Sequence, residues 1–201
     1  MVTTKNPALF WLSLFSLTFG VIAIDYSIYV GNTGSAFWFC YIALVLFGLG
    51  GILCSPTLVV SQLQIIFLPV LIWLGDFLFV LSPKNSLWGI SDYFFTTLTP
   101  LARLISLEHF FIIPLGLILL SLLPKPKFVW SIVISATQTV LTFLLILFFT
   151  KPTDNANCVF SSCASVVPDG PLYQLYWFGL MFAMMIISSG IFRLFYFFKK
   201  N

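Results

Sequence analysis

The one histidine of the chain, His109, is the residue whose chemistry is most informative. It follows Arg103 by six positions, with Ser106 midway between them. Imidazole transfers protons near neutral pH, a carboxylate fixes its tautomer, and a guanidinium binds oxyanions through two parallel hydrogen bonds. With Asp76 and Asp92 as the carboxylates, these residues predict a catalytic group in which His109 is a general base or a metal ligand and Arg103 holds an anion.

Helical spacing predicts which of these side chains share a face. At about 100° per residue, Arg103, Ser106 and His109 spread over about 120° of one helix face. Glu108 falls on roughly the opposite side, so we expect it to contact a different helix. The predicted pocket around His109 is completed by three further polar residues, which are Tyr93, Asp154 and Asn157.

A purely structural role for the same residues is the alternative hypothesis. An ion pair between Arg103 and Asp76 or Asp92 would order two neighbouring helices. Polar side chains in apolar helices also join helices by hydrogen bonds, and we interpret one such line in this way. Its members are Ser131, Ser135, Gln138 and Thr142.

The cysteines fall into two kinds. Cys158 and Cys163 are separated by four residues in a polar segment, and in an oxidising compartment such a pair closes a small disulfide ring. Metal binding by this pair is the weaker alternative, because no histidine lies near it in the sequence. Cys40 and Cys54 are interpreted as small packing residues. We therefore predict one disulfide; no metal site is assigned, a metal at His109 stays an open alternative to its role as general base, and no cofactor is identified.

Composition defines the kind of element that must position these residues. The chain has 201 residues, of which 60% are hydrophobic and 7% charged, and its mean hydropathy is +1.09. Soluble domains carry about 25% charged residues, because their surfaces must be hydrated. Nine basic and six acidic residues do not suffice for that, and a net charge of +3 makes no basic stripe. A soluble enzyme, a disordered protein and a nucleic-acid binder are excluded.

The pattern of apolar runs predicts an all-α polytopic membrane bundle. A bilayer core about 30 Å thick needs about 20 apolar residues in a helix. We expect a single transmembrane domain over residues 1–201 with one sizeable external loop at residues 151–171. Six transmembrane helices are predicted, at residues 8–29, 34–54, 57–81, 99–123, 128–150 and 172–197.

The distribution of lysines predicts the orientation of the bundle. With six spans, both termini lie on one side, and that side collects Lys5, Lys125, Lys127, Lys199 and Lys200. The opposite side receives Lys84 and Lys151. We therefore expect a multi-pass protein of the bacterial inner membrane, with both termini in the cytoplasm and residues 151–171 outside.

Several function classes lack their motifs. The sequence contains no Walker loop, no G-x-S-x-G elbow, no H-E-x-x-H helix and no dinucleotide fingerprint. The first hypothesis is an enzyme that acts on a lipid or lipid-linked substrate through an outward-facing pocket of His, Asp and Arg side chains. A non-catalytic subunit or assembly factor with a membrane-protein partner is the second hypothesis, and a small transporter is the third. Membrane lipids are expected partners and nucleic acid is not.

Four short stretches resemble a group of small, uncharacterised bacterial multi-span membrane proteins. The stretches are WLGDF at 73–77, SDYF at 91–94, RLISLEH at 103–109 followed by Pro114, and TDNANCVF at 153–160. The resemblance implies a multi-span membrane protein. It implies no activity, substrate, cofactor or partner, so the function is argued from the residues themselves.

Overall fold

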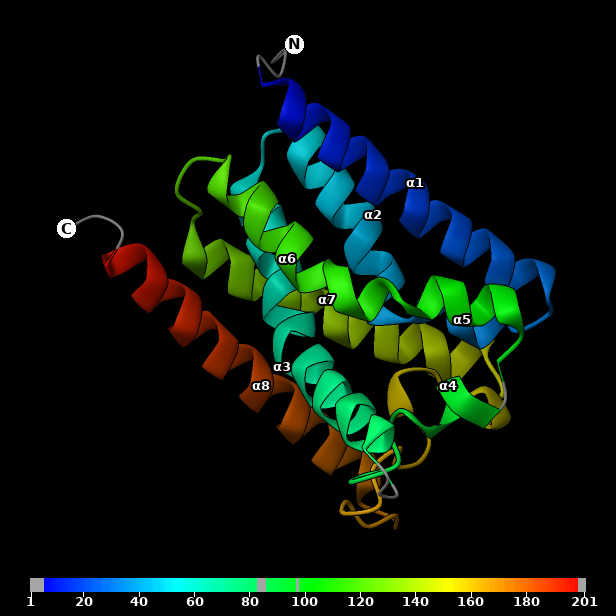
Figure 1. Ribbon diagram of the computed structural model, residues 1–201. Coiled ribbons are helices and arrows are strands. Elements are labelled where there is room, and N and C mark those ends of the chain that lie inside the picture. The colour runs from blue at the N-terminus through cyan, green and yellow to red at the C-terminus, as the bar shows by residue number, and fades with distance from the viewer. Residues whose placement is uncertain (1–5, 83–85, 97, 199–201) are drawn as a thin grey trace.

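The computed structural model describes residues 6–82, 86–96 and 98–198, which form helices and connecting loops (Figure 1). Four lysines used in the orientation argument, Lys5, Lys84, Lys199 and Lys200, lie outside the described residues. In chain order the elements are α1 (Pro7–Tyr29), η1 (Thr33–Phe37), α2 (Phe39–Ile52), α3 (Pro56–Leu81), α4 (Asp92–Thr96), α5 (Pro100–Ser106), α6 (Glu108–Ser121), α7 (Phe128–Phe149), η2 (Pro152–Asp154), η3 (Ala156–Cys158) and α8 (Tyr173–Phe198).

Five of the described helical segments are long and apolar enough to cross a membrane. They are Pro7–Tyr29, Pro56–Leu81, Pro100–Ser121, Phe128–Phe149 and Tyr173–Tyr196. The predicted all-α membrane class is therefore confirmed, and the chain is a multi-pass membrane protein by the composition of its helices. The second predicted span is shorter than expected, because α2 has 14 residues and is only about 21 Å long.

The short second helix has a local cause. The predicted run at residues 34–54 begins with a 3₁₀ turn, η1, rather than with α-helix. The side chain of Asn32 caps this turn by accepting a hydrogen bond from the backbone N–H of Ser35 at 3.2 Å. Trp38 then adopts an extended conformation, and α2 begins after it. Caps of this kind divide one apolar run into two elements.

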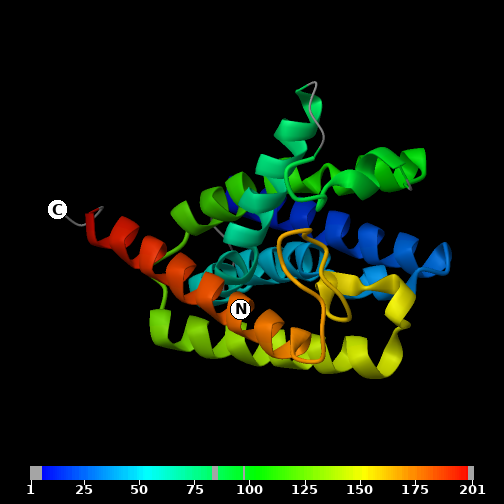
Figure 2. The same cartoon turned by 90° about the horizontal axis from the view of Figure 1, so that it is seen from below.

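The two ends of the bundle carry different connections. The start of α1 and the end of α8 lie at the same end of the bundle, near the α2–α3 and α6–α7 connections (Figure 1). The segments that join α3 to α5 and α7 to α8 lie at the opposite end (Figure 1). Seen from below, the α7–α8 loop (residues 151–171), drawn yellow to orange, lies on the side of the bundle that faces the viewer (Figure 2).

Small residues let α1 and α2 pack closely side by side. The hydroxyl of Ser16 donates a hydrogen bond to the carbonyl of Leu44 at 2.7 Å, which joins the two backbones directly. Close approach through small residues is the usual way in which helices associate in a membrane. The buried residues of α1 are Leu9, Ser13, Ser16, Gly20, Ala23 and Ser27.

A buried polar network joins α3, α7 and α8 in the half of the bundle near the termini. The side-chain amides of Gln62 and Gln138 exchange two hydrogen bonds, at 2.7 and 2.9 Å. Gln64 donates to the hydroxyls of Ser131 and Ser189 at 3.0 and 3.1 Å. Ser131 and Gln138 of the polar line on α7 thus join this helix to α3, as expected if the line serves helix packing.

The fourth predicted span is interrupted at Leu107, which separates α5 from α6. The carbonyl of Ser106 accepts a hydrogen bond from Nδ1 of His109 at 2.9 Å. The backbone N–H of Phe110 bonds instead to the carbonyl of Leu107 at 3.0 Å, one residue closer than in an α-helix. A side chain has replaced a helical backbone bond, so residues 103–109 do not form one regular helix.

Candidate functional site

A cavity of about 660 Å³ lies between the helices and the α7–α8 loop. Its walls come from α1, α2, α3, α5, α6 and α8, and the α7–α8 loop contributes residues to it as well. Five residues that the sequence assigns to the site line this cavity, and they are His109, Tyr93, Ser106, Asp154 and Asn157.

Asp76 has a different position and is not among the cavity-lining residues. Its side chain is fully buried and accepts three hydrogen bonds. The donors are the backbone N–H of Trp88 at 2.7 Å and both the N–H and the hydroxyl of Ser91 at 2.8 Å each. Asp76 therefore holds the segment after α3 against that helix.

Arg103 and Asp92 are exposed and also lie away from the cavity lining. Arg103 donates a hydrogen bond to the carbonyl of Phe95 at 3.3 Å, and Asp92 accepts one from the hydroxyl of Ser86 at 3.1 Å. Within residues 6–82, 86–96 and 98–198, no ion pair joins Arg103 to Asp76 or Asp92. The four predicted catalytic residues therefore do not converge, and only His109 reaches the cavity.

His109 is held in one orientation by contacts on three sides. Its ring stacks on the indole of Trp73, with ring centroids 4.3 Å apart. Nδ1 lies 2.9 Å from the carbonyl of Ser106, which can only accept, so Nδ1 carries the proton. Nε2 is the remaining nitrogen, and it lies 3.7 Å from Sγ of Cys40.

Glu108 is the site residue that sequence reasoning misplaced. Its carboxylate is fully buried, and Oε1 lies 3.1 Å from Nδ1 of His109. The expectation that Glu108 contacts a different helix from His109 is wrong, because ligand atoms of Glu108 and of His109 both lie within 4.8 Å of Cys40 Sγ on α2.

Cys40 is the site residue that sequence reasoning missed. It is the second residue of α2, it is buried, and it lines the cavity together with His109. A lone cysteine in an apolar helix is typical of packing, so the sequence carries no signal for its role. For Glu108 the sequence does carry a signal, since it is directly followed by His109.

The polarity of the cavity favours an uncharged ligand group. Of the described residues that line it, none is Lys or Arg, and Asp154 is the one carboxylate. The indole N–H groups of Trp38 and Trp73 are buried and have no hydrogen-bond acceptor among the described residues. Burial raises the pKa of the Tyr93 phenol, so this hydroxyl stays protonated. A cavity that offers hydrogen-bond donors but no Lys or Arg among its described lining residues suits a ligand with a neutral acceptor oxygen, such as a carbonyl.

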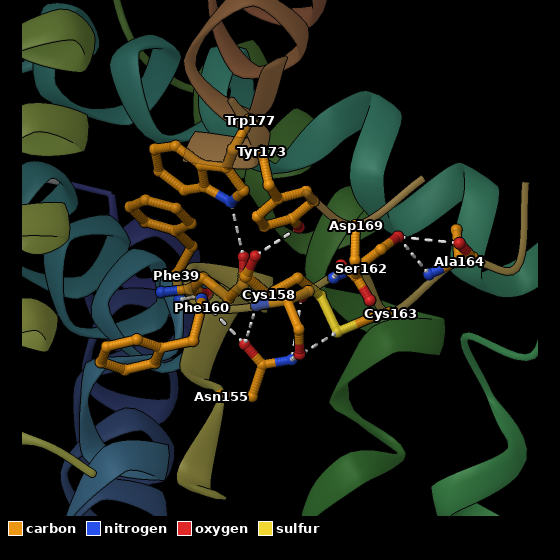
Figure 3. The surroundings of a disulfide bond; sticks show 12 residues. Phe39, Asn155, Cys158, Phe160, Ser162, Cys163, Ala164, Asp169, Tyr173 and Trp177 are labelled. Carbon is orange, nitrogen blue, oxygen red and sulfur yellow. Dashed lines mark hydrogen bonds between the residues drawn. A yellow bond between two sulfur atoms is a disulfide. The ribbon is translucent and has the colours of Figure 1, made fainter. Parts of the chain in front are cut away.

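The α7–α8 loop forms one side of the cavity. The conformation of this loop is fixed by local contacts (Figure 3). The sulfur atoms of Cys158 and Cys163 lie at disulfide-bonding distance, so the predicted pairing is confirmed. Tyr173 and Trp177 of α8 donate hydrogen bonds to the carbonyls of Cys158 and Asn157.

Asn157 ties the loop to the start of α2. Its side-chain amide donates to the carbonyl of Phe37 at 2.8 Å and accepts from the N–H of Phe39 at 3.0 Å. Next to it, Ala156 and Val159 are fully buried. Asn157 thus positions the loop over the cavity, next to Cys40.

Comparison of the chain with family models, with curated proteins and with solved structures finds no match. By the composition of its helices the chain is an integral membrane protein. Its cavity is lined in part by the buried Cys40 and His109, and the carboxylate of Glu108 lies next to the histidine ring.

Proposed function

We propose that this integral membrane protein is an enzyme that acts on a lipid or lipid-linked substrate bound in the cavity. The observation that carries the proposal is His109, which lines a cavity of about 660 Å³ while a buried carboxylate lies 3.1 Å from its Nδ1. A largely apolar cavity with a few converging polar groups is typical of a small-molecule site.

The residues have distinct roles in the proposed reaction. The substrate presents an ester or amide carbonyl to the indole N–H groups of Trp38 and Trp73, which stabilise the oxyanion that develops there. His109 takes a proton from water through Nε2, the resulting hydroxide adds to the carbonyl carbon, and the leaving group departs with that proton. Glu108 stabilises the imidazolium that forms in between.

This proposal revises the chemistry expected from the sequence. Arg103 is exposed and bonded to Phe95, so it supplies no anion clamp inside the cavity. A phosphate group would enter a space without a cation among its described lining residues. We therefore place the reacting group in the acyl part of the substrate rather than in a phosphate head group.

The transporter hypothesis is less well supported. A conduit needs polar groups that solvent or substrate can reach in both halves of the membrane. In the half near the termini, Gln62, Gln64 and Gln138 are bonded to one another or to serine hydroxyls, and the first two are fully buried. Such a network joins helices and leaves few groups for a passing solute.

The test is a conversion assay on lipids. Purified protein is incubated in vesicles made from a total bacterial polar lipid extract, and the lipids are compared by mass spectrometry before and after. We expect release of an acyl chain or of a lipid fragment by the wild type. His109→Ala should reduce this conversion at least about 100-fold, which is the usual size of a general-base contribution.

Two alanine positions give a matched control for the location of the reaction. Ala102→Trp fills the cavity from α5, whereas Ala8→Trp places the same ring on an exposed part of α1 that does not line it. We expect conversion to fall in the first variant and to persist in the second. Equal activity of wild type and His109→Ala would contradict the proposal.

A further inference from the structure

Three side chains of different chemistry converge at one border of the cavity. Cys40 comes from α2, and Glu108 and His109 come from the first turn of α6. All three are buried, and one ligand atom of each lies within 4.8 Å of the others. A thiol, an imidazole and a carboxylate are the three side-chain groups that most often bind transition metals.

Glu108 provides the second, independent observation. Its side chain has no exposed surface, and neither carboxylate oxygen accepts a hydrogen bond from any residue the structure describes. The contact of Oε1 with Nδ1 of His109 at 3.1 Å is not a hydrogen bond, because the Nδ1 proton is directed to the carbonyl of Ser106. A buried carboxylate without donors is costly, and a bound cation would remove that cost.

The orientation of His109 is the one a metal ligand needs. Metal-binding histidines usually donate their second N–H to a carbonyl or carboxylate, which fixes the tautomer. Here Nδ1 lies 2.9 Å from the carbonyl of Ser106, and this leaves the lone pair of Nε2 facing Sγ of Cys40 at 3.7 Å. Tetrahedral zinc with usual bond lengths separates such a nitrogen and sulfur by about 3.5 Å.

We propose that Cys40, Glu108 and His109 bind one transition-metal cation of the Zn²⁺ class. The mixed sulfur, nitrogen and oxygen ligands favour Zn²⁺ over Mg²⁺ or Ca²⁺, which prefer oxygen alone. Cys40 and His109 line the cavity and Glu108 does not, so the open fourth position of the metal faces the cavity.

This site deepens the proposed function and rests on it only for the role of the metal. A zinc ion with three protein ligands lowers the pKa of its bound water to about 7. With the ion bound, Nε2 of His109 would hold the metal and Glu108 would be a second ligand, so the metal would activate the water in place of the imidazole base. Metal binding itself requires no substrate and can be measured without turnover.

The first measurement is metal content. Protein purified in detergent, with the disulfide intact, is equilibrated with Zn²⁺ or Co²⁺, freed of excess metal and analysed by mass spectrometry. We expect one equivalent per chain, and in the Co²⁺ form a thiolate charge-transfer absorption in the near ultraviolet. Cys40→Ser should remove this absorption, and Glu108→Gln should weaken metal binding at least about tenfold.

Two sets of control variants separate this site from other cysteines. Cys54 is the second free cysteine and lies just after α2, so Cys54→Ser should keep both the metal and the absorption. The double variant Cys158→Ser, Cys163→Ser should also keep them. Loss of the metal in this double variant alone would overturn the proposal, since it would place the ion in the α7–α8 loop.

Alkylation of Cys40 gives a readout that does not depend on a variant folding. In the wild type, a maleimide should modify Cys40 slowly with metal bound and at least about tenfold faster after a chelator is added, while Cys54 reacts equally in both states. No bound metal together with chelator-independent alkylation would overturn the site, leaving a Cys–His pair. Bound metal without lipid conversion would instead refute the proposed function and leave the site standing.

Discussion

At the scale of single residues, the structure shows that three carboxylates, which the sequence alone does not distinguish, have different environments. Asp76, Asp92 and Glu108 all come from the segments around His109, yet each has a different environment. Asp76 accepts three hydrogen bonds, Asp92 is exposed, and Glu108 is buried beside the imidazole without a donor bonded to it. Of these three carboxylates, Glu108 is the one that lies beside His109.

Asp76 provides the residue-scale prediction. Asp76→Ala should lower the free energy of unfolding by about 2–3 kcal/mol, because the N–H groups of Trp88 and Ser91 lose a charged acceptor. The measurement is unfolding in a detergent titration. Asp92→Ala removes an exposed carboxylate and should change stability by less than about 0.5 kcal/mol. Unchanged stability in Asp76→Ala would show that these hydrogen bonds are not what Asp76 contributes.

The limits of prediction for the site lie in contacts between distant residues. His109, Tyr93 and Asn157 could be assigned to one pocket because depth in the membrane follows from position in a span. Cys40 could not, because its pairing with His109 spans 69 positions and depends on how α2 docks on α6. Arg103 was misplaced because a helical wheel assumes a regular helix, and the bond from His109 to Ser106 breaks that regularity.

At the scale of elements, hydropathy predicts the long helices well and their interruptions poorly. The predicted run at 57–81 agrees with α3, and 128–150 agrees with α7. The turn η1 and the break at Leu107 are set by side-chain hydrogen bonds that leave the apolar run intact. An average over a window of about 19 residues does not detect such bonds.

The contact between α1 and α2 gives the element-scale prediction. At Gly48, an added Cβ would lie 2.6 Å from the carbonyl oxygen of Ser13 and 2.7 Å from the backbone nitrogen of Leu17. Gly48→Ala must therefore push the helices apart, and we expect a loss of about 1–3 kcal/mol in unfolding free energy.

Gly179 on α8 offers a matched control, because an added Cβ there meets nothing within 4 Å. The same change, Gly179→Ala, should leave the unfolding midpoint unchanged or slightly raised, since alanine favours a helix over glycine. Equal effects of the two substitutions would mean that helix propensity, rather than the α1–α2 contact, determines the response.

At the scale of the whole molecule, the position of the termini bears on topology. α1 begins and α8 ends at the same end of the bundle (Figure 1), which agrees with the expectation of an even number of passes. Five helices are long enough to cross, so we propose that η1 and α2 together make the sixth pass. At about 2.0 Å per residue in η1 and 1.5 Å in α2, the two would measure about 31 Å if they lay end to end.

Orientation is the prediction at this scale. We expect a reporter fused after Asn201 to be active only in the form that works in the cytoplasm, because the α6–α7 connection, whose sequence contains Lys125 and Lys127, lies at the same end of the bundle as the end of α8 (Figure 1). A second reporter inserted after Gly170, in the exposed part of the α7–α8 loop, should give the opposite result. The same signal from both positions would contradict the six-pass arrangement.

The hydrogen bonds from α8 to the α7–α8 loop have a consequence for how the protein is made. Tyr173 and Trp177 belong to α8, which is synthesised after α1 to α7, and they donate hydrogen bonds to the carbonyls of Cys158 and Asn157 (Figure 3). During synthesis, α1 to α7 enter the membrane before these donors exist. The cavity next to His109 is therefore completed only after α8 has been synthesised, because α8 supplies both part of its wall and the donors that hold the α7–α8 loop in place.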